Sequence, residues 1–291
     1  MPELPDITVY LEALESRVAG ETLLGVQVTS PFVLRSVQPP LSAFAGRRTT
    51  SVERIGKRIV IGTDGALFLV IHLMIAGRLK WLAPEKVPKG GLATFRFSTG
   101  SLVLTEAGTK RRASITAVEG RDELRALDRG GMGVLTADDA MVVARLRSEN
   151  HTLKRSLTDP RLFDGIGNAY SDEILHAARL SPLQLTSKLN DDDAMRLAAA
   201  MRSTLLLWTD RLRREVGTGW PAKVTAFRPD MMVHGRFRLP CPVCGAPVQR
   251  IRYAENETNY CARCQTGGRL LADRAMSRLL KEDWPRSLDE L

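Results

Sequence analysis

The sequence predicts an α+β protein of several domains: an N-terminal helix with a β-sandwich, a helical domain, and a C-terminal four-cysteine zinc finger. Three observations lead to this fold class. Short alternating segments fill residues 22–118, helical periodicity fills residues 121–215, and all four cysteines lie between residues 241 and 264. The 291 residues suffice for about two domains of ordinary size. The predicted divisions are residues 1–120, 121–238, 239–268 and a helical tail at 269–291.

The first element is a helix near the amino terminus. Apolar residues recur there at three- and four-residue spacing, which places them on one helix face, and Gly20 supplies a stop. The residues of this face are Ile7, Leu11, Leu14 and Val18.

Pro2 gives the start of this helix an unusual chemistry. Removal of Met1 would expose a secondary amine, which titrates near neutrality and is then partly nucleophilic. Glu3 beside it is placed to move protons. The dipeptide alone favours a simpler explanation, because a second-position proline also just delays a helix. If Met1 is retained, the Pro2 nitrogen is a tertiary amide without a lone pair to donate.

Short strands follow the helix. They alternate between apolar and polar residues and are separated by turn signals at Asp64-Gly65 and Thr99-Gly100. Hairpin turns at this spacing predict a β-sandwich. The expected strands are residues 24–28, 49–52, 58–61, 67–72, 93–97 and 102–104.

The helical part contains a turn suited to an anion. A helix, a tight glycine turn and a second helix start follow one another between residues 157 and 170. Gly167 permits close backbone approach, and Asn168 at a helix start can donate to an anion, so phosphate is the expected ligand. An ordinary interhelical turn explains these residues equally well. Further on, three aspartates at 191–193 mark the start of a long amphipathic helix.

The cysteines form two pairs, Cys241 with Cys244 and Cys261 with Cys264, separated by sixteen residues. Each pair can supply two corners of a tetrahedron, so the spacing predicts one structural Zn²⁺ bound by four thiolates. Two disulfides are the alternative, which a reducing cytosol disfavours. Between the pairs, residues 248–253 alternate and residues 255–258 read as a turn, which predicts a two-stranded ribbon with arginines on one face. A last amphipathic helix is expected near residues 270–279.

The charge of the chain indicates its partner. Lysine and arginine total 42 against 33 acids, so the net charge is +9, and arginine suits phosphate contacts. Nucleic acid is the expected partner, although a solvated basic surface would give the same count. The chain has no apolar run long enough for a membrane span and no signal peptide, so we expect a cytoplasmic protein.

Several landmarks occur in one order along the chain: Pro2-Glu3-Leu4-Pro5, Lys57, His72-Leu73, Lys154, Gly165-Ile166-Gly167-Asn168, Val233-His234-Gly235-Arg236 and the four cysteines. In this order they resemble the formamidopyrimidine-DNA glycosylase and endonuclease VIII family over nearly the whole chain. The glycine turn is then the end of a helix–two-turn–helix signature. The resemblance implies a base-excision-repair DNA glycosylase with AP-lyase activity, acting as a monomer on double-stranded DNA with a damaged base or abasic site.

The resemblance also implies roles for single residues. Pro2 would attack C1′ of the damaged nucleotide and form an iminium, while Glu3 would transfer protons. Lys57 completes the expected catalytic set. The expected DNA-binding residues are His72, Arg111, Lys154, Asn168 and Arg236.

The sequence departs from the family pattern at a few positions. Asn256 stands where the finger normally has a phosphate-binding arginine. The residues that would fill the space of the extruded base align with Ile75, Arg111 and Ala113, of which only Arg111 matches. Asp6 replaces the usual glutamate. Two other readings therefore stay open: a damaged-DNA-binding protein of the same fold without turnover, and a zinc-ribbon RNA-binding or ribosome-associated protein.

Overall fold

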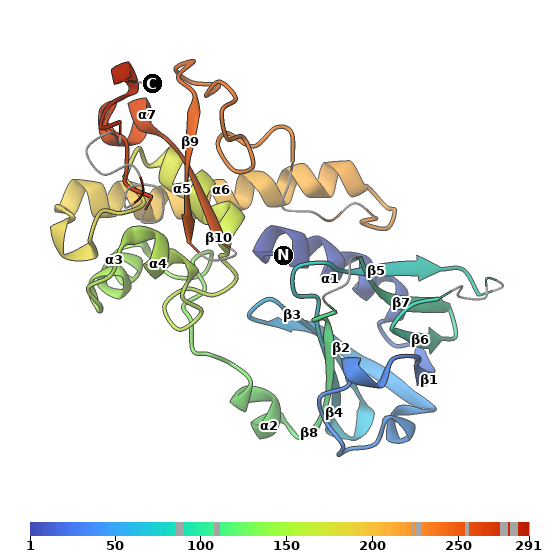
Figure 1. Cartoon of the computed structure of the whole chain (residues 1–291). Helices are drawn as coiled ribbons and strands as arrows, with labels where there is room; N and C mark the ends of the chain where they lie inside the picture. The colour runs from blue at the N-terminus through green and yellow to red at the C-terminus, as the bar shows by residue number, and fades with distance from the viewer. Residues whose placement is uncertain are drawn as a thin grey trace. The chain divides into compact units, whose positions relative to one another are not determined.

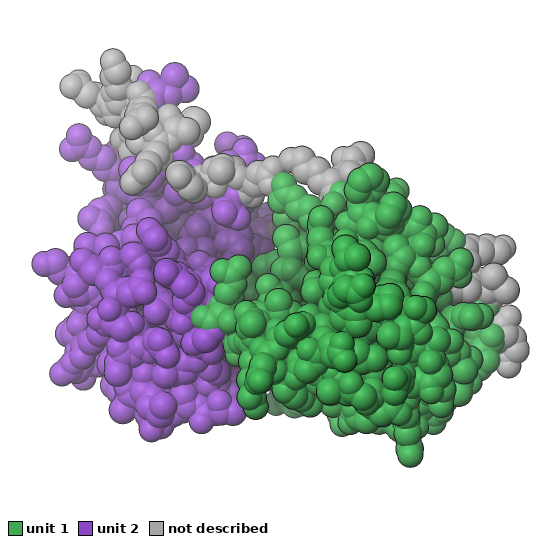
Figure 2. Space-filling view, turned by 90° about the horizontal axis from the view of Figure 1, so that it is seen from below, with its two compact units in different colours: residues 1–129, 209–225 green, residues 130–208, 226–291 purple. Residues whose placement is uncertain are grey.

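The computed structural model of the chain is shown in Figure 1. It describes all residues except 85, 87–89, 108–110, 223, 225–227, 254–255, 274–278, 280–284 and 291. The chain forms two compact units, coloured separately in Figure 2. The first contains residues 1–129 and 209–225, and the second contains residues 130–208 and 226–291. Residues 121–129 and 209–225 thus pack with the β-rich unit, and the finger packs with the helices.

The first unit contains an eight-stranded sheet in the order β5-β7-β6-β1-β2-β3-β4-β8, with all neighbours antiparallel. The sheet has two halves, β5-β7-β6-β1 and β2-β3-β4-β8. Few residues pair between them, because β1 and β2 pair only through Thr22 with Arg48 and Leu23 with Arg47. The strands are β1 (Thr22–Val28), β2 (Arg47–Ile55), β3 (Arg58–Thr63), β4 (Leu67–His72), β5 (Gly77–Leu82), β6 (Ala93–Phe97), β7 (Gly100–Glu106) and β8 (Ser114–Glu119).

The two halves of the sheet and helix α1 (Leu4–Val18) enclose one apolar core. Alternation along β3 explains the layering: Ile59 and Ile61 face this core, whereas Val60 faces a smaller cluster with Leu124 of helix α2 (Arg121–Ala126). Because β3 and β4 are covered on both faces, their sequences are nearly all apolar. The predicted N-terminal helix, strands and sandwich arrangement are confirmed, whereas β5 and β8 were not among the predicted strands.

The loop after the long helix α6 (Asp191–Val216) packs onto the first unit through Trp220. The Trp220 ring centroid lies 5.6 Å from that of Tyr10 and 6.1 Å from that of Trp81, and its Nε1 donates to the Leu79 carbonyl at 2.8 Å. The Arg17 guanidinium lies over the same ring at 5.6 Å. Trp220 therefore anchors the loop by packing its ring against the core and donating a hydrogen bond to the backbone.

The second unit contains short helices with polar caps, as the helical periodicity predicts. Asp138 accepts from the Met141 amide, Thr152 accepts from the Arg155 amide, and Asn190 accepts from the Asp193 amide at the start of α6. In the described part of the chain, the other helices are α3 (Asp139–Arg147), α4 (Leu153–Thr158), α5 (Asn168–Ala177) and α7 (Ala262–Thr266). Short 3-10 segments there are Pro31–Val33, Leu41–Phe44, Asp64–Ala66, Thr186–Lys188 and Leu288–Glu290.

The predicted two-stranded ribbon is present as β9 (Val248–Tyr253) and β10 (Asn256–Cys261). Strand β10 begins at Asn256, so the turn is shorter than the predicted 255–258, and residues 254–255 lie outside the described part. The predicted last helix falls mostly on 274–278 and 280–284, which also lie outside the described residues. Leu270 and Leu271 pack in an apolar cluster with Tyr260. Among the described residues, no helix has the length and apolarity needed to cross a membrane.

Candidate active site and metal centre

Pro2 and Glu3 are buried at the head of α1, and Glu3 is only 1% exposed. The helix itself fixes them. Glu3 is the N-cap residue, its amide donates to Asp6 Oδ2 at 3.0 Å, and its side chain accepts from the Asp6 amide. This reciprocal pair keeps the Glu3 backbone rigid, so the nitrogen of the preceding Pro2 has a defined position.

Two cations lie near the amino terminus. Burial lowers the pKa of the Met1 amine, the positive charges of Arg78 and Lys57 lower it further, and Glu3 and Asp6 oppose this. Lys57 was predicted from the sequence, but Arg78 was not, because it lies on the unpredicted strand β5. An amine in this environment holds its proton less tightly than in water, which favours a nucleophilic form.

Lys57 and His72 lie at neighbouring ends of the sheet. Lys57 occupies the turn between β2 and β3, and His72 ends β4 opposite Arg58 and Ser114. Burial lowers the pKa of His72 to about 4, and the charges of Arg58 and Lys57 add to this shift. His72 is therefore neutral at pH 7 and can offer a hydrogen bond to an anion, whereas Lys57 offers a full charge.

The turn after His72 presents Ile75 to solvent. Met74 adopts the left-handed backbone conformation at φ 51°, and Arg78 closes the turn by donating to the Ile75 and Gly77 carbonyls at 3.3 and 2.6 Å. Gly77 is required here, since a Cβ would lie 2.3 Å from the Leu73 carbonyl oxygen. Ile75 is 55% exposed at the tip of this turn.

The segment around Arg111 is held from one side by Glu106. The Arg112 amide donates to both carboxylate oxygens at 2.9 Å, and the Ala113 amide donates to them at 3.1 and 3.3 Å. Arg111 itself is exposed, whereas Ala113 is 3% exposed and belongs to the main core. Of the three residues aligned with the space-filling set, Ile75 and Arg111 thus remain at the surface and Ala113 does not.

In the second unit, Lys154 is tied into the protein. Its Nζ donates to the Asn168 carbonyl at 2.7 Å and to Asp172 Oδ1 at 2.5 Å. Asn168 is the first residue of α5, as predicted, and its Nδ2 donates to the Glu257 carbonyl of β10 at 2.7 Å. The two residues predicted to meet DNA from this turn therefore also join α4, α5 and the ribbon.

Asp172 and Glu173 are the buried centre of this arrangement, and sequence reasoning missed both. Besides Lys154, Asp172 accepts through Oδ2 from His234 Nδ1 at 2.8 Å and from the Asn259 amide at 3.1 Å. Figure 1 shows α5 against the ribbon. The only sequence signal was the position of two adjacent acids on a short amphipathic helix.

Glu173 holds the segment that precedes the finger. It accepts from the backbone amides of Met232, Val233 and His234 at 2.8, 2.9 and 3.0 Å. Burial raises the pKa of Glu173, and these three amide bonds oppose the shift. The Val233-His234-Gly235 motif is thus a structural joint between α5 and the finger.

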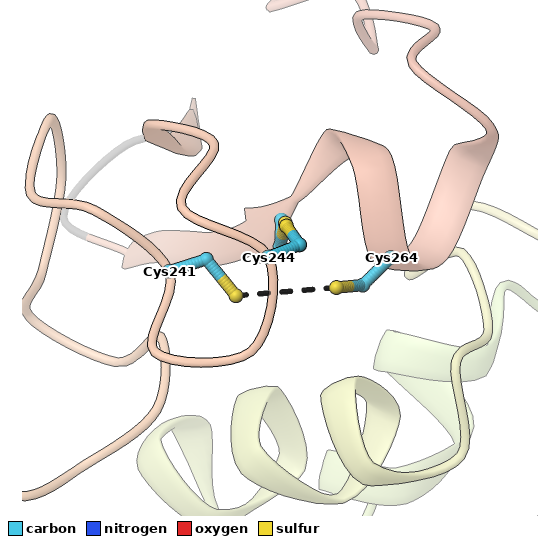
Figure 3. Close-up of side chains that lie close together, drawn as sticks. Cys241, Cys244 and Cys264 are labelled. Carbon is cyan, nitrogen blue, oxygen red and sulfur yellow. Dashed lines mark hydrogen bonds between the residues drawn. The ribbon is translucent and has the colours of Figure 1, made fainter.

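The four cysteines converge. Their sulfur atoms all lie within 4.8 Å of one another, with Cys241 Sγ 3.9 Å from Cys264 Sγ and Cys244 Sγ 3.4 Å from Cys261 Sγ. Figure 3 shows Cys241 and Cys264 pointing toward each other, with Cys244 nearby. A tetrahedron of thiolates about 2.3 Å from zinc has sulfur atoms about 3.8 Å apart, so the residues fit structural zinc.

Comparison with known proteins follows the same order of parts. Residues 1–115 match the formamidopyrimidine-DNA glycosylase N-terminal domain, residues 135–208 its H2TH domain, and residues 238–267 the zinc finger found in FPG and IleRS. The formamidopyrimidine-DNA glycosylase of Heliobacterium modesticaldum is 31% identical over 91% of this chain and 100% of its own. The chain belongs to the formamidopyrimidine-DNA glycosylase family. The resemblance found in the sequence is confirmed, and with it the fold class and the four-cysteine zinc finger.

Two further proteins are similar to this chain. An uncharacterized formamidopyrimidine-DNA glycosylase-like protein of Mycobacterium tuberculosis is 43% identical over 56% of this chain and 99% of its own length. The Lactococcus lactis Fpg, solved in a complex with DNA containing an abasic site, shares the fold at a TM-score of 0.78 and 22% identity. That comparison covers 91% of this chain and 99% of the other.

Arg236, which precedes the finger, and Arg252, on its ribbon, both lie near acceptors. Arg236 donates to the Pro229 and Pro240 carbonyls, each at 3.1 Å. Arg252 is 61% exposed and lies opposite Glu257 on the ribbon, 3.4 Å from its Oε2. The family position occupied here by Asn256 lies at the exposed start of β10. Arg252 is therefore an exposed positive charge at this end of the ribbon.

Proposed function

We propose that the protein is a DNA glycosylase with AP-lyase activity, which excises an oxidised base and nicks the strand through Pro2 once Met1 is removed. The observation that carries this proposal is the buried head of α1. Pro2 lies there beside Glu3, at a site where burial, with the charges of Arg78 and Lys57, lowers the pKa of the amine of the neighbouring Met1. A protein that only bound DNA would have no need of this arrangement.

The proposed reaction begins with the Pro2 nitrogen. Its lone pair forms a bond to C1′ of the damaged nucleotide, the C1′–N bond to the base breaks, and the base leaves with the proton that the Pro2 nitrogen loses. The C1′–O4′ bond then breaks as the ring oxygen is protonated, and the nitrogen lone pair completes a C1′=N iminium on the opened sugar. The resulting iminium acidifies the C2′ proton, so loss of that proton expels the 3′ phosphate, and a second elimination can expel the 5′ phosphate. Glu3 would protonate the sugar ring oxygen and then accept and return protons. The base must be extruded first, because C1′ is shielded in a stacked duplex.

The proposed partner is double-stranded DNA with a damaged base or an abasic site, bound by one copy of the chain. The net charge of +9 supports phosphate binding, and the Lactococcus lactis relative was solved with abasic-site DNA. In the first unit Lys57 would supply charge and His72 a neutral hydrogen bond to the backbone, while Arg111 would reach the unpaired base. In the second, the α5 start at Asn168 would hold phosphate, with Lys154 fixing that turn and Arg236 the adjoining loop.

A second candidate is a damaged-DNA-binding protein of the same fold without turnover. Two departures from the family pattern favour it: Ala113 is buried and cannot fill the space left by an extruded base, and Asn256 stands at the exposed start of β10 in place of a phosphate-binding arginine. The two candidates differ in covalent chemistry. They do not differ in the expected preference for damaged duplex.

Borohydride trapping of the Met1-processed protein tests the proposal. Duplexes carrying an abasic site, 8-oxoguanine, formamidopyrimidine or an oxidised pyrimidine are offered in parallel, and the adduct is mapped by mass spectrometry. An adduct on Pro2 is the expected result, and Pro2→Gly should remove it while DNA binding persists. Binding without an adduct on any duplex would establish the non-catalytic candidate instead.

A further inference from the structure

His176 lies against the metal centre without belonging to the finger. It is on α5, is 5% exposed, and its Nε2 lies 3.4 Å from Cys241 Sγ, which is itself on a residue only 2% exposed. The helix that carries His176 begins at Asn168, the residue of the proposed phosphate-binding turn. The contact therefore joins the cysteine cluster directly to that helix.

The chemistry of a metal-bound thiolate sets the direction of this contact. A cysteine bound to zinc has no S–H, so its sulfur can only accept a hydrogen bond. His176 Nε2 must then carry the hydrogen and donate to Cys241 Sγ. Such a bond withdraws charge from the sulfur of a site with four negative ligands, and it fixes the ligand's orientation.

The surroundings of His176 make the strength of this bond matter. His176 and Cys264 both line a cavity of about 240 Å³, together with Trp208, Met232 and Val243. Val243, between the first two cysteines, is 54% exposed. Small chelators and oxidants can thus approach the cluster on this side, where zinc is retained only as firmly as its thiolates are held.

We propose that His176 is a positioning residue of the structural zinc site. Its N–H···S hydrogen bond to the zinc ligand Cys241 slows zinc loss and fastens the finger to α5. This proposal rests on the zinc finger and not on the Pro2 reaction. It can therefore fail while the proposed glycosylase activity stands, and the reverse is also true.

Two substitutions separate the hydrogen bond from packing. His176→Phe fills the site without a donor, whereas His176→Gln keeps an N–H donor on a side chain of similar length. His151→Phe is the matched control, because His151 lies in the same unit, has 22% of its side chain exposed, and pairs with Glu149 at 2.8 Å. Zinc transfer to a chromophoric chelator and the sulfur-to-cobalt charge-transfer band of the Co²⁺-substituted protein are measured for the full-length chain.

We expect His176→Phe to weaken zinc retention about 10- to 100-fold and to shift the cobalt band, with His176→Gln closer to the wild type and His151→Phe unchanged. A purely structural role would lower the unfolding temperature and leave the cobalt band in place. The proposal is overturned if the band and the zinc transfer rate of His176→Phe match the wild type. Should His176→Phe not fold, a wild-type cobalt band after His176→Ala would overturn it equally.

Discussion

The two units hold their candidate residues in different ways. In the first, Pro2, Lys57 and His72 lie at the ends of a helix, a turn and a strand, around an apolar core that contains none of them. In the second, the buried carboxylate of Asp172 joins Lys154 to the ribbon of the finger, and Asn168 donates to the ribbon directly. In the first unit, the ends of backbone elements position the candidate residues. In the second unit, a buried ion pair and the four-cysteine site position them.

This difference determines how each unit responds to loss of the metal or of a charged partner. A core of alternating apolar strands does not depend on any metal, so the sandwich should fold with or without zinc. The second unit contains a buried ion pair and four thiolates brought together by the fold, and neither tolerates the loss of one partner. The following predictions test this contrast, from the largest expected effect to the smallest.

Zinc removal should show the largest difference between the two units. We expect chelation of zinc to abolish DNA binding, because the fold of the finger depends on the metal. The backbone amides in the strands of the first unit should stay protected from hydrogen exchange. Hydrogen exchange of both units, measured beside a DNA titration, checks this. Undiminished binding after metal analysis has verified removal would show that the finger is dispensable.

Substitution of Asp172 should have the next largest effect. Asp172→Ala leaves the Lys154 ammonium, whose side chain is 12% exposed, without its carboxylate. We expect a loss of about 3–5 kcal/mol in the free energy of unfolding of the second unit, measured by denaturant titration with zinc bound.

Asp191→Ala is the matched control for that experiment. Asp191 pairs with Arg147 at 2.7 Å in the same unit, but 90% of its side chain is exposed. The expected change is below about 1 kcal/mol. Equal losses for the two variants would contradict a special role for the buried carboxylate.

His72 should make the first unit sensitive to acid. Its pKa is about 4 in the folded protein against an ordinary 6.5, so between these values the unfolded chain binds a proton that the folded chain does not. The free energy of unfolding therefore falls as the pH drops from 6.5 to 4, by a total of about 3 kcal/mol from this group. Hydrogen exchange of β3 and β4, measured as a function of pH, should show this fall in the free energy of unfolding. His72→Gln should reduce the slope of that free energy against pH. A slope unchanged in the variant would assign the acid sensitivity to other groups.

The smallest effect is expected at an exposed pair of the first unit. Arg213 meets Glu12 at 2.6 Å, with 47% and 44% of the two side chains exposed. Arg213→Ala should change the unfolding free energy by less than about 1 kcal/mol and by still less in high salt. A loss comparable to that of Asp172→Ala would show that the contrast between the units does not depend on burial.

Local patterns predicted most of the elements, and their failures have a common cause. The two unpredicted strands, β5 and β8, are the two edges of the sheet. Strand β5 does alternate, with Arg78 and Lys80 between Leu79 and Trp81, but it is short, carries two charges and pairs on one side only, as edge strands do, and it was not predicted. Arg78 was missed as a candidate for the same reason.

The sequence alone determined the helix that begins after Pro2 and Glu3, the inner strands, the turn that ends at Asn168, and the metal site, because each depends on residues close together in the chain. Only the tertiary structure brought Asp172 to Lys154, His234 and Asn259, and His176 to Cys241. It also decided that Ala113 is buried and Ile75 exposed. These contacts join positions far apart in the chain, and their polar groups are paired because they are buried, a condition that no local pattern records.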